Sequence, residues 1–205
     1  MRHISPAPMT DCPTPDNAQH AAMTRLVGGD TLALDLIYQA HSGPVYRYLL
    51  ALCGDASVAA DAMHDAFVAL IDRPAGFDST RGTLGGYLAG IARRVLWARW
   101  RDPLHQATPL DSSDEAFDEP MSDAADDPMQ MVVTIQDSTA LMAALLDLPW
   151  VFREAVVLVD LQERDYREAA AIAGIPLNTL RTRVLRGRRR LALALGAKHM
   201  KERTL

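Results

Sequence analysis

The chain has 205 residues, of which 49% are hydrophobic, and its formal net charge is −5. This length suits one ordinary domain or two small ones. A negative net charge argues against a nucleic-acid partner, because phosphate contacts depend on clustered Lys and Arg. The charges are segregated, however: every charged residue from Asp102 to Asp137 is acidic, and arginines gather before and after this stretch. The charge of each segment therefore indicates possible partners better than the net charge of the chain does.

Several classes of protein and site are disfavoured by what the sequence lacks. Cys12 and Cys53 have no CxxC or Cys/His spacing, so neither a disulfide framework nor a metal site is expected. No apolar run is long enough for a signal peptide or a membrane span. The histidines are scattered, and no Gly-rich phosphate loop or nucleophile-base pairing is present. We therefore expect a cytoplasmic protein that is not an enzyme and has no cofactor, small-molecule substrate or membrane insertion.

The first helical domain is expected over residues 19–101. Residues 1–18 are rich in Pro, Asp and Thr without periodicity, which predicts a disordered leader. After them, apolar side chains recur every three to four residues, as on amphipathic helices. Gly54-Asp55 and Pro74-Ala75-Gly76 supply the breaks between these helices.

The last helix of this domain has an unusual polar side. On a helical wheel, the side opposite the apolar face carries an arginine and two tryptophans, flanked by two further arginines: Arg93, Trp97, Trp100, Arg94 and Arg101. Indoles interleaved with arginines suit stacking on unpaired bases beside phosphate contacts. The alternative is that the indoles pack against a neighbouring helix. The polar loop of residues 76–82 before this helix would admit a nucleotide.

Residues 102–137 are expected to form a flexible acidic linker. They combine Asp, Pro and Ser with few apolar side chains, so burial would gain too little to offset the entropy of ordering. A second helical domain is expected over residues 138–205. Because β-branched residues nowhere alternate strictly, the expected fold class is all-α.

The start of a helix-turn-helix is predicted within the second domain. Asp165 stands three residues before Glu168, a capping-box pattern that predicts a helix start at Tyr166. Small residues continue this helix, and Gly174 suits the left-handed conformation that ends it.

A second, basic helix follows from about Leu177 to Leu195. Pro176 is tolerated before it, because proline lacks an N–H that a first helical turn would leave unpaired. No acidic residue interrupts positions 176–195. Arg and Asn side chains near the helix start can bond to base edges, and later arginines can pair with phosphates. A solvated basic helix is the alternative.

Four stretches together resemble the extracytoplasmic-function group of sigma-70 family factors. The residues that carry the resemblance are Leu26–Asp30 with Leu36–Tyr38, Ala60–Val68, Phe77–Gly82 with Tyr87, Leu88 and Ile91–Arg93, and lastly Leu148, Pro149, Arg153, Glu168–Ala170 and Asn178–Arg183. The first stretch is similar to the family's first helix, and the second to the acidic helix that docks on the polymerase clamp. The third is similar to the loop and helix that melt and read the −10 element, and the fourth to the domain that reads the −35 element. The acidic linker resembles the segment that threads toward the RNA exit path.

The resemblance implies a non-catalytic subunit that binds the β and β′ subunits of RNA polymerase core and promoter DNA. The residues implied for core polymerase are Asp61, His64, Asp65 and Phe67. Those implied for the opened −10 strand are Arg81, Tyr87, Arg93, Arg94, Trp97 and Arg101. Those implied for the −35 major groove are Asn178, Thr179, Arg181, Thr182, Arg183 and Arg186. An anti-sigma factor that masks both domains is a further expected partner.

The chain departs from the family's pattern at several positions. His64-Asp65 replaces the usual Gln-Glu, and Tyr87 replaces the usual Trp before the melting helix. Arg94 replaces an Asn and adds positive charge toward DNA, whereas Asn178 replaces a Gly and becomes a candidate base contact.

Two other functions stay open. A sigma mimic that only titrates an anti-sigma factor would need no base-reading arginines. An ordinary two-domain transcriptional regulator with a ligand-binding N-terminal half predicts an apolar pocket, and it gives no reason for the stripe of Arg93, Trp97 and Arg101.

Overall fold

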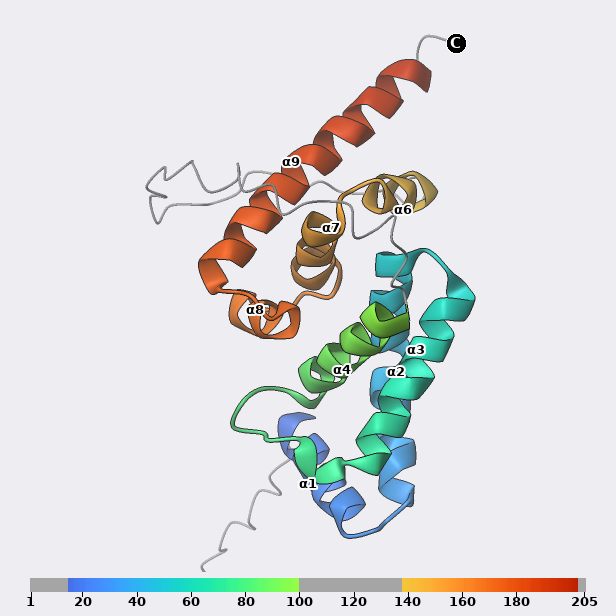
Figure 1. The fold of residues 1–205 in the computed structure, drawn as a ribbon, viewed down its shortest axis with the longest axis vertical. Helices are drawn as coiled ribbons and strands as arrows, with labels where there is room; N and C mark the ends of the chain where they lie inside the picture. Colours follow the sequence, from blue (N-terminus) through green and yellow to red (C-terminus); the bar gives the residue numbers. More distant parts are fainter. Residues whose placement is uncertain (1–14, 100–137, 203–205) are drawn as a thin grey trace, which may run out of the picture.

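The computed structural model describes residues 15–99 and 138–202, and within these ranges every regular element is a helix (Figure 1). The predicted linker, Trp100, Arg101 and Cys12 lie outside the described residues. In the same ranges, no helix combines the length and the apolar character that crossing a bilayer requires. The all-α prediction is confirmed for the described part of the chain.

The N-terminal half consists of α1 (Pro15–Val27), α2 (Leu32–Cys53), α3 (Ala56–Asp72), the short 3-10 helix η1 (Pro74–Gly76) and α4 (Leu84–Arg99). The break between α2 and α3 is the predicted one. Gly54 has a φ of +71° and its N–H donates to the Leu50 carbonyl at 2.8 Å, while the Asp55 carboxylate accepts from two backbone N–H groups and caps α3. Helix α1 starts at Pro15, inside the segment predicted to be a disordered leader, and proline is well suited to a first helical turn.

The C-terminal half consists of α6 (Ser138–Leu146), α7 (Trp150–Val156), the π-helical turn η4 (Val157–Leu161), α8 (Tyr166–Ala173) and α9 (Leu177–Glu202). Asp165 caps α8 as predicted, and Gly174 ends it at a φ of +68°. Helix α9 runs beyond the predicted end at Leu195, because Ala and Lys continue a helix readily. Short α8, its glycine turn and basic α9 form the predicted helix-turn-helix.

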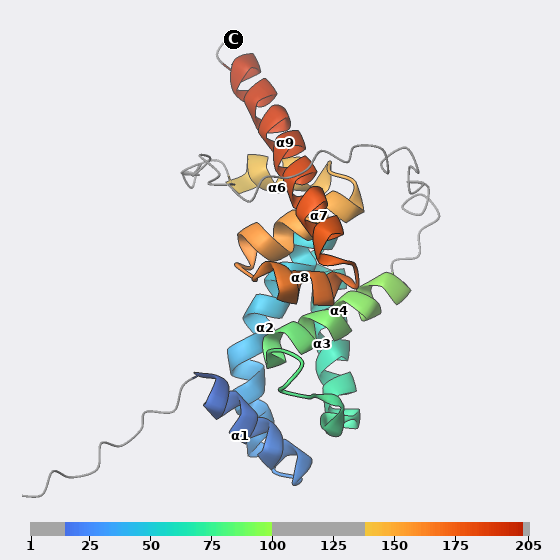
Figure 2. The same cartoon turned by 90° about the vertical axis from the view of Figure 1, so that its left-hand side faces the viewer.

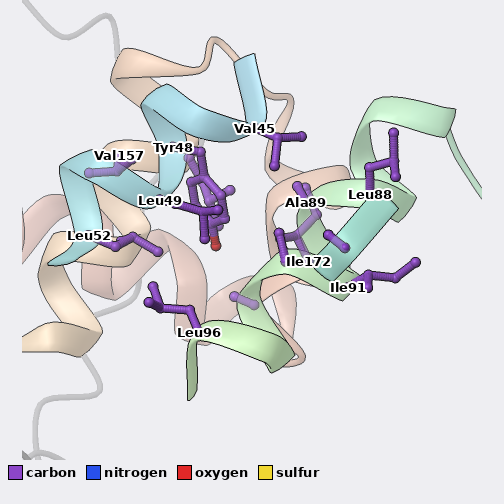
Figure 3. Close-up of a cluster of buried hydrophobic side chains, with 14 of the residues drawn as sticks. Val45, Tyr48, Leu49, Leu52, Leu88, Ala89, Ile91, Leu96, Val157 and Ile172 are labelled. Atoms are coloured by element: carbon purple, nitrogen blue, oxygen red, sulfur yellow. The ribbon is translucent and has the colours of Figure 1, made fainter. Parts of the chain in front are cut away.

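The two halves pack against each other and share one apolar core. Helix α8 lies beside α4 in both views of the molecule (Figures 1 and 2). Figure 3 shows Val157 and Ile172, from the C-terminal half, among Tyr48, Leu49 and Ala89 of the N-terminal half. All of these side chains are at most 8% exposed. The described halves therefore form one packed unit.

Close approach at one edge of this packing depends on a glycine. A Cβ atom at Gly54 would lie 2.7 Å from the Cδ1 atom of Leu146. The glycine that follows α2 thus lets the Leu146 side chain of α6 approach closely, and a side chain at this position would make Leu146 shift.

Candidate functional site

The residues predicted to bind core polymerase lie on α3. Asp61 and His64 are exposed and Asp65 is half-buried. Arg99 of α4 reaches across to this face, where its Nη1 atom lies 3.4 Å from the Asp61 carboxylate and its Nη2 atom pairs with Asp65. The acidic face of α3 is thus open to solvent and tied to the end of α4.

Phe67 differs from its neighbours on α3. Its side chain is only 3% exposed, and its ring lies 4.8 Å from the ring of Tyr38, centroid to centroid. Val68 and Ile71, in contrast, are 42% and 45% exposed on the same helix. Phe67 therefore packs beneath this face in the free chain, and Val68 and Ile71, which are not among the predicted residues, are its exposed apolar side chains.

The loop and helix predicted to hold the −10 strand present a mixed surface. Arg81 and Arg94 are exposed. Tyr87 is half-buried, with its ring centroid 5.6 Å from that of Phe77, and a Cβ at Gly76 would lie 2.7 Å from its hydroxyl. The loop before α4 thus packs against the side chain of Tyr87.

Hydrogen bonds inside the loop hold its backbone. The Asp78 carboxylate accepts from the Thr80 N–H at 2.9 Å and from the Thr80 hydroxyl at 2.7 Å. These bonds to Thr80, the side-chain bond first, lower the pKa of Asp78. The loop therefore carries a fixed negative charge close to Arg81.

Arg93 and Trp97 face the C-terminal half of the chain. The Arg93 guanidinium pairs with the Glu154 carboxylate of α7 through Nε, and its Nη2 donates to the second oxygen at 3.3 Å. Trp97 remains 45% exposed but meets Trp150 edge to face, with ring centroids 5.6 Å apart. The indole of Trp97 thus contacts a neighbouring helix and also remains partly open to solvent.

The predicted −35 residues lie in the first turns of α9. Asn178, Arg181 and Thr182 are exposed, and the Thr182 hydroxyl donates to the Asn178 carbonyl at 3.0 Å. Three others are partly buried: Thr179, Arg183 and Arg186. Burial lowers the pKa of Arg183. The helix start therefore offers an exposed polar edge, while Arg183 turns toward the protein.

Two buried charges at the boundary between the halves were missing from the predicted site residues. Glu154 is 1% exposed and accepts from the Tyr48 hydroxyl at 3.4 Å as well as from Arg93. Arg153 is 6% exposed and donates to the carbonyls of Leu52, at 2.5 Å, and Leu148, at 2.9 Å. Adjacent charged residues inside the apolar run of α7 were the only signal in the sequence.

Comparisons with known proteins agree with the order of these surfaces. The family model "Sigma-70 region 2" matches residues 37–103, and "Sigma-70, region 4" matches residues 138–191. The chain is 31% identical over 180 residues to the ECF RNA polymerase sigma factor SigE of Mycolicibacterium smegmatis, covering 85% of this chain and 66% of that protein. It is 27% identical over 160 residues to the ECF RNA polymerase sigma factor SigM of Bacillus subtilis, covering 78% of this chain and 93% of that one.

Solved structures show the same fold. CnrH in complex with the cytosolic domain of CnrY has a TM-score of 0.64 at 18% identity, covering 88% of this chain and 98% of that one. The sigma factor RpoE of Bartonella quintana, in complex with the anti-sigma factor NepR, has a TM-score of 0.58 at 25% identity, covering 79% and 96%. Members of the sigma-70 family are non-enzymatic factors that direct RNA polymerase to promoters. The chain belongs to the extracytoplasmic-function group of this family, because both sigma-70 regions match in order and the similar proteins are sigma factors of that group.

Proposed function

We propose that this sigma factor uses three separate surfaces for initiation. The acidic face of α3 binds core polymerase, α4 and the loop before it hold the opened −10 strand, and the start of α9 reads the −35 element. The observation that carries the proposal is the exposed edge of Asn178, Arg181 and Thr182 directly after the Gly174 turn. This is where a helix-turn-helix presents side chains to base edges in the major groove.

The surface for the opened strand combines charge with aromatic rings. Arg81 and Arg94 offer exposed guanidinium groups for phosphates, and Tyr87 with Phe77 offers rings beside them. Stacking on aromatic rings beside a basic groove is how proteins hold unpaired strands. Arg93 and Trp97 belong to this surface once they are released from α7, and Arg101 extends the same stripe.

The surface for polymerase is made by α3. Asp61, His64 and Asp65 supply its polar groups, and Phe67 holds the helix from below. Exposed apolar side chains next to charged ones are typical of protein interfaces. The partner is the clamp of core polymerase.

The proposal also covers setting and regulation. The chain works in the cytoplasm, catalyses no reaction itself and needs no cofactor. It is restrained by an anti-sigma factor, which is supported by the structural relative RpoE, solved in complex with the anti-sigma factor NepR.

Reconstituted transcription tests this function. Purified protein is added to sigma-free core polymerase with fragmented genomic DNA of the source bacterium, and the transcript starts are sequenced. We expect discrete starts with shared upstream elements about two helical turns apart. Polymerase binding without initiation would favour the sigma mimic, and no binding to polymerase would favour a separate regulator.

A further inference from the structure

Glu154 is a carboxylate buried between the two halves of the chain. It lies in α7 of the C-terminal half, and its strongest partner is Arg93 of α4 in the N-terminal half. The Tyr48 hydroxyl of α2 donates to the same carboxylate at 3.4 Å. A buried charge is tolerated only where an opposite charge and hydrogen bonds compensate it. The contact therefore fixes α7 against α4 at one defined position.

Arg93 belongs to the predicted −10 surface. The Glu154 carboxylate thus holds a guanidinium group of that surface, as a DNA phosphate would.

Further contacts hold the halves together around this cluster. At the rim, Thr83, which directly precedes α4, donates to Glu168 of α8, and Arg164 pairs with Glu168 at 2.9 Å. Beneath them lies the shared apolar core, in which Val157 and Ile172 pack among side chains of α2 and α4 (Figure 3). The closed arrangement is thus supported by apolar packing as well as by charge.

The contact occupies groups that the opened strand would need. Arg93 is bound to Glu154, and Trp97 has one edge against Trp150. Both partners are in α7, so a strand that engages Arg93 and Trp97 together would have to displace that helix from α4.

We propose that Glu154 is an autoinhibitory contact that keeps this sigma factor closed and withholds Arg93 from DNA until the two halves separate. The inference rests on the proposed function, because it takes Arg93 to be a DNA ligand. Separation breaks the ion pair and exposes apolar core to water, so the open state is minor in the free chain. A minor open state weakens apparent DNA affinity in proportion to its population.

The test compares the full-length wild type with Glu154→Gln, which keeps the size of the side chain and removes its charge. Glu163→Gln is the matched control, since Glu163 is exposed in the same half and the net charge changes equally. Small-angle scattering measures the radius of gyration. Fluorescence anisotropy measures affinity for a labelled duplex of randomised sequence with a central unpaired bubble.

We expect Glu154→Gln to raise the radius of gyration and to bind the probe about tenfold more tightly than wild type, because closed states of this kind leave the open one at a few per cent. Glu163→Gln should match wild type in both. An unchanged radius and affinity for Glu154→Gln would overturn the inference. An expanded chain with unchanged affinity would instead remove Arg93 from the DNA-binding set, and so overturn the proposed role of that residue.

A second variant tests the inference in case Glu154→Gln prevents α7 from folding. Glu168→Ala removes the acceptor of the Thr83 hydroxyl at the rim and leaves the core cluster intact. It should shift radius and affinity in the same direction by a smaller amount. If Glu154→Gln loses helical circular dichroism, the Glu168→Ala variant alone tests the inference, and wild-type radius and affinity for it would overturn the inference.

Discussion

The outer face of α3 and the polar face of α4 belong to the same domain but differ in how far other parts of the chain cover them. On α3, Asp61 and His64 are open to solvent. On α4, Arg93 is bound by Glu154 and Trp97 is partly covered by Trp150. If the proposed surfaces are right, the polymerase surface is open while part of the −10 surface is covered, and we infer that polymerase binding precedes opening.

The largest effect is expected on stability, at the buried arginine that joins the two halves. Arg153→Ala leaves the buried carbonyls of Leu52 and Leu148 without their donor, so the free energy of unfolding should fall by about 3 kcal/mol. Urea unfolding followed by circular dichroism measures this loss. The exposed Arg167→Ala is the control and should change stability little; equal losses for both variants would mean that the boundary between the halves adds no stability.

The next effect concerns the proposed −35 contact of Arg181, which stays exposed while Glu154 binds Arg93. Arg181→Ala should weaken transcription from a cognate promoter by about 2 kcal/mol in apparent affinity, because a bidentate contact to a base is lost. Arg189→Ala, also exposed on α9, should cost less and act equally on all sequences. Measurement uses promoter variants altered at −35, and an Arg181→Ala protein that still discriminates among them would disprove the reading role.

A smaller effect is expected on the open face of α3. Asp61→Ala should weaken binding to core polymerase by about 1 kcal/mol, since one partly exposed charge contributes little more at an interface. Asp72→Ala, exposed at the end of the same helix, should leave affinity unchanged. Fluorescence titration with core polymerase gives both values, and equal losses would show that net charge alone matters.

The smallest effect depends on pH. His41 is buried beside Gly85, facing Arg164, which pairs with Glu168. Burial first, and then the Arg164 charge, lower the pKa of His41. The unfolded chain therefore binds more protons as pH falls below the ordinary histidine pKa, and stability is lost in that range.

Acidification from about pH 7.5 to about pH 5.5 should cost about 0.5 kcal/mol through this residue. Thermal unfolding across this range measures the loss. His41→Gln should flatten the pH dependence, and an equally steep dependence in that variant would assign it to other groups.

Local features of the fold could be predicted from the sequence because their causes are local. The Asp165 cap, the Gly174 turn and the inward face of α9 at Leu180 and Val184 all follow from neighbours within a few residues. The exposed edge at Arg181 followed from the same pattern. These predictions needed no knowledge of what lies across the chain.

The packing of the two halves could not be predicted in this way. Arg93 and Glu154 are 61 residues apart, and the predicted linker between their domains has no helical periodicity to indicate a contact. The sequence does not indicate which residue a charged side chain within α7 will contact, so Glu154 was not among the predicted site residues. The burial of Phe67 could not be predicted either, because a motif shows residue type and not which side is buried.

Energy transfer between two labels tests most directly whether the chain opens on polymerase. With Cys12 and Cys53 replaced by serine, donor and acceptor are placed at Ser57→Cys on α3 and Leu193→Cys on α9, both exposed positions. We expect one high transfer efficiency in the free protein and a marked fall when core polymerase is added, before any DNA is present. An efficiency that stays unchanged on the polymerase would contradict the account.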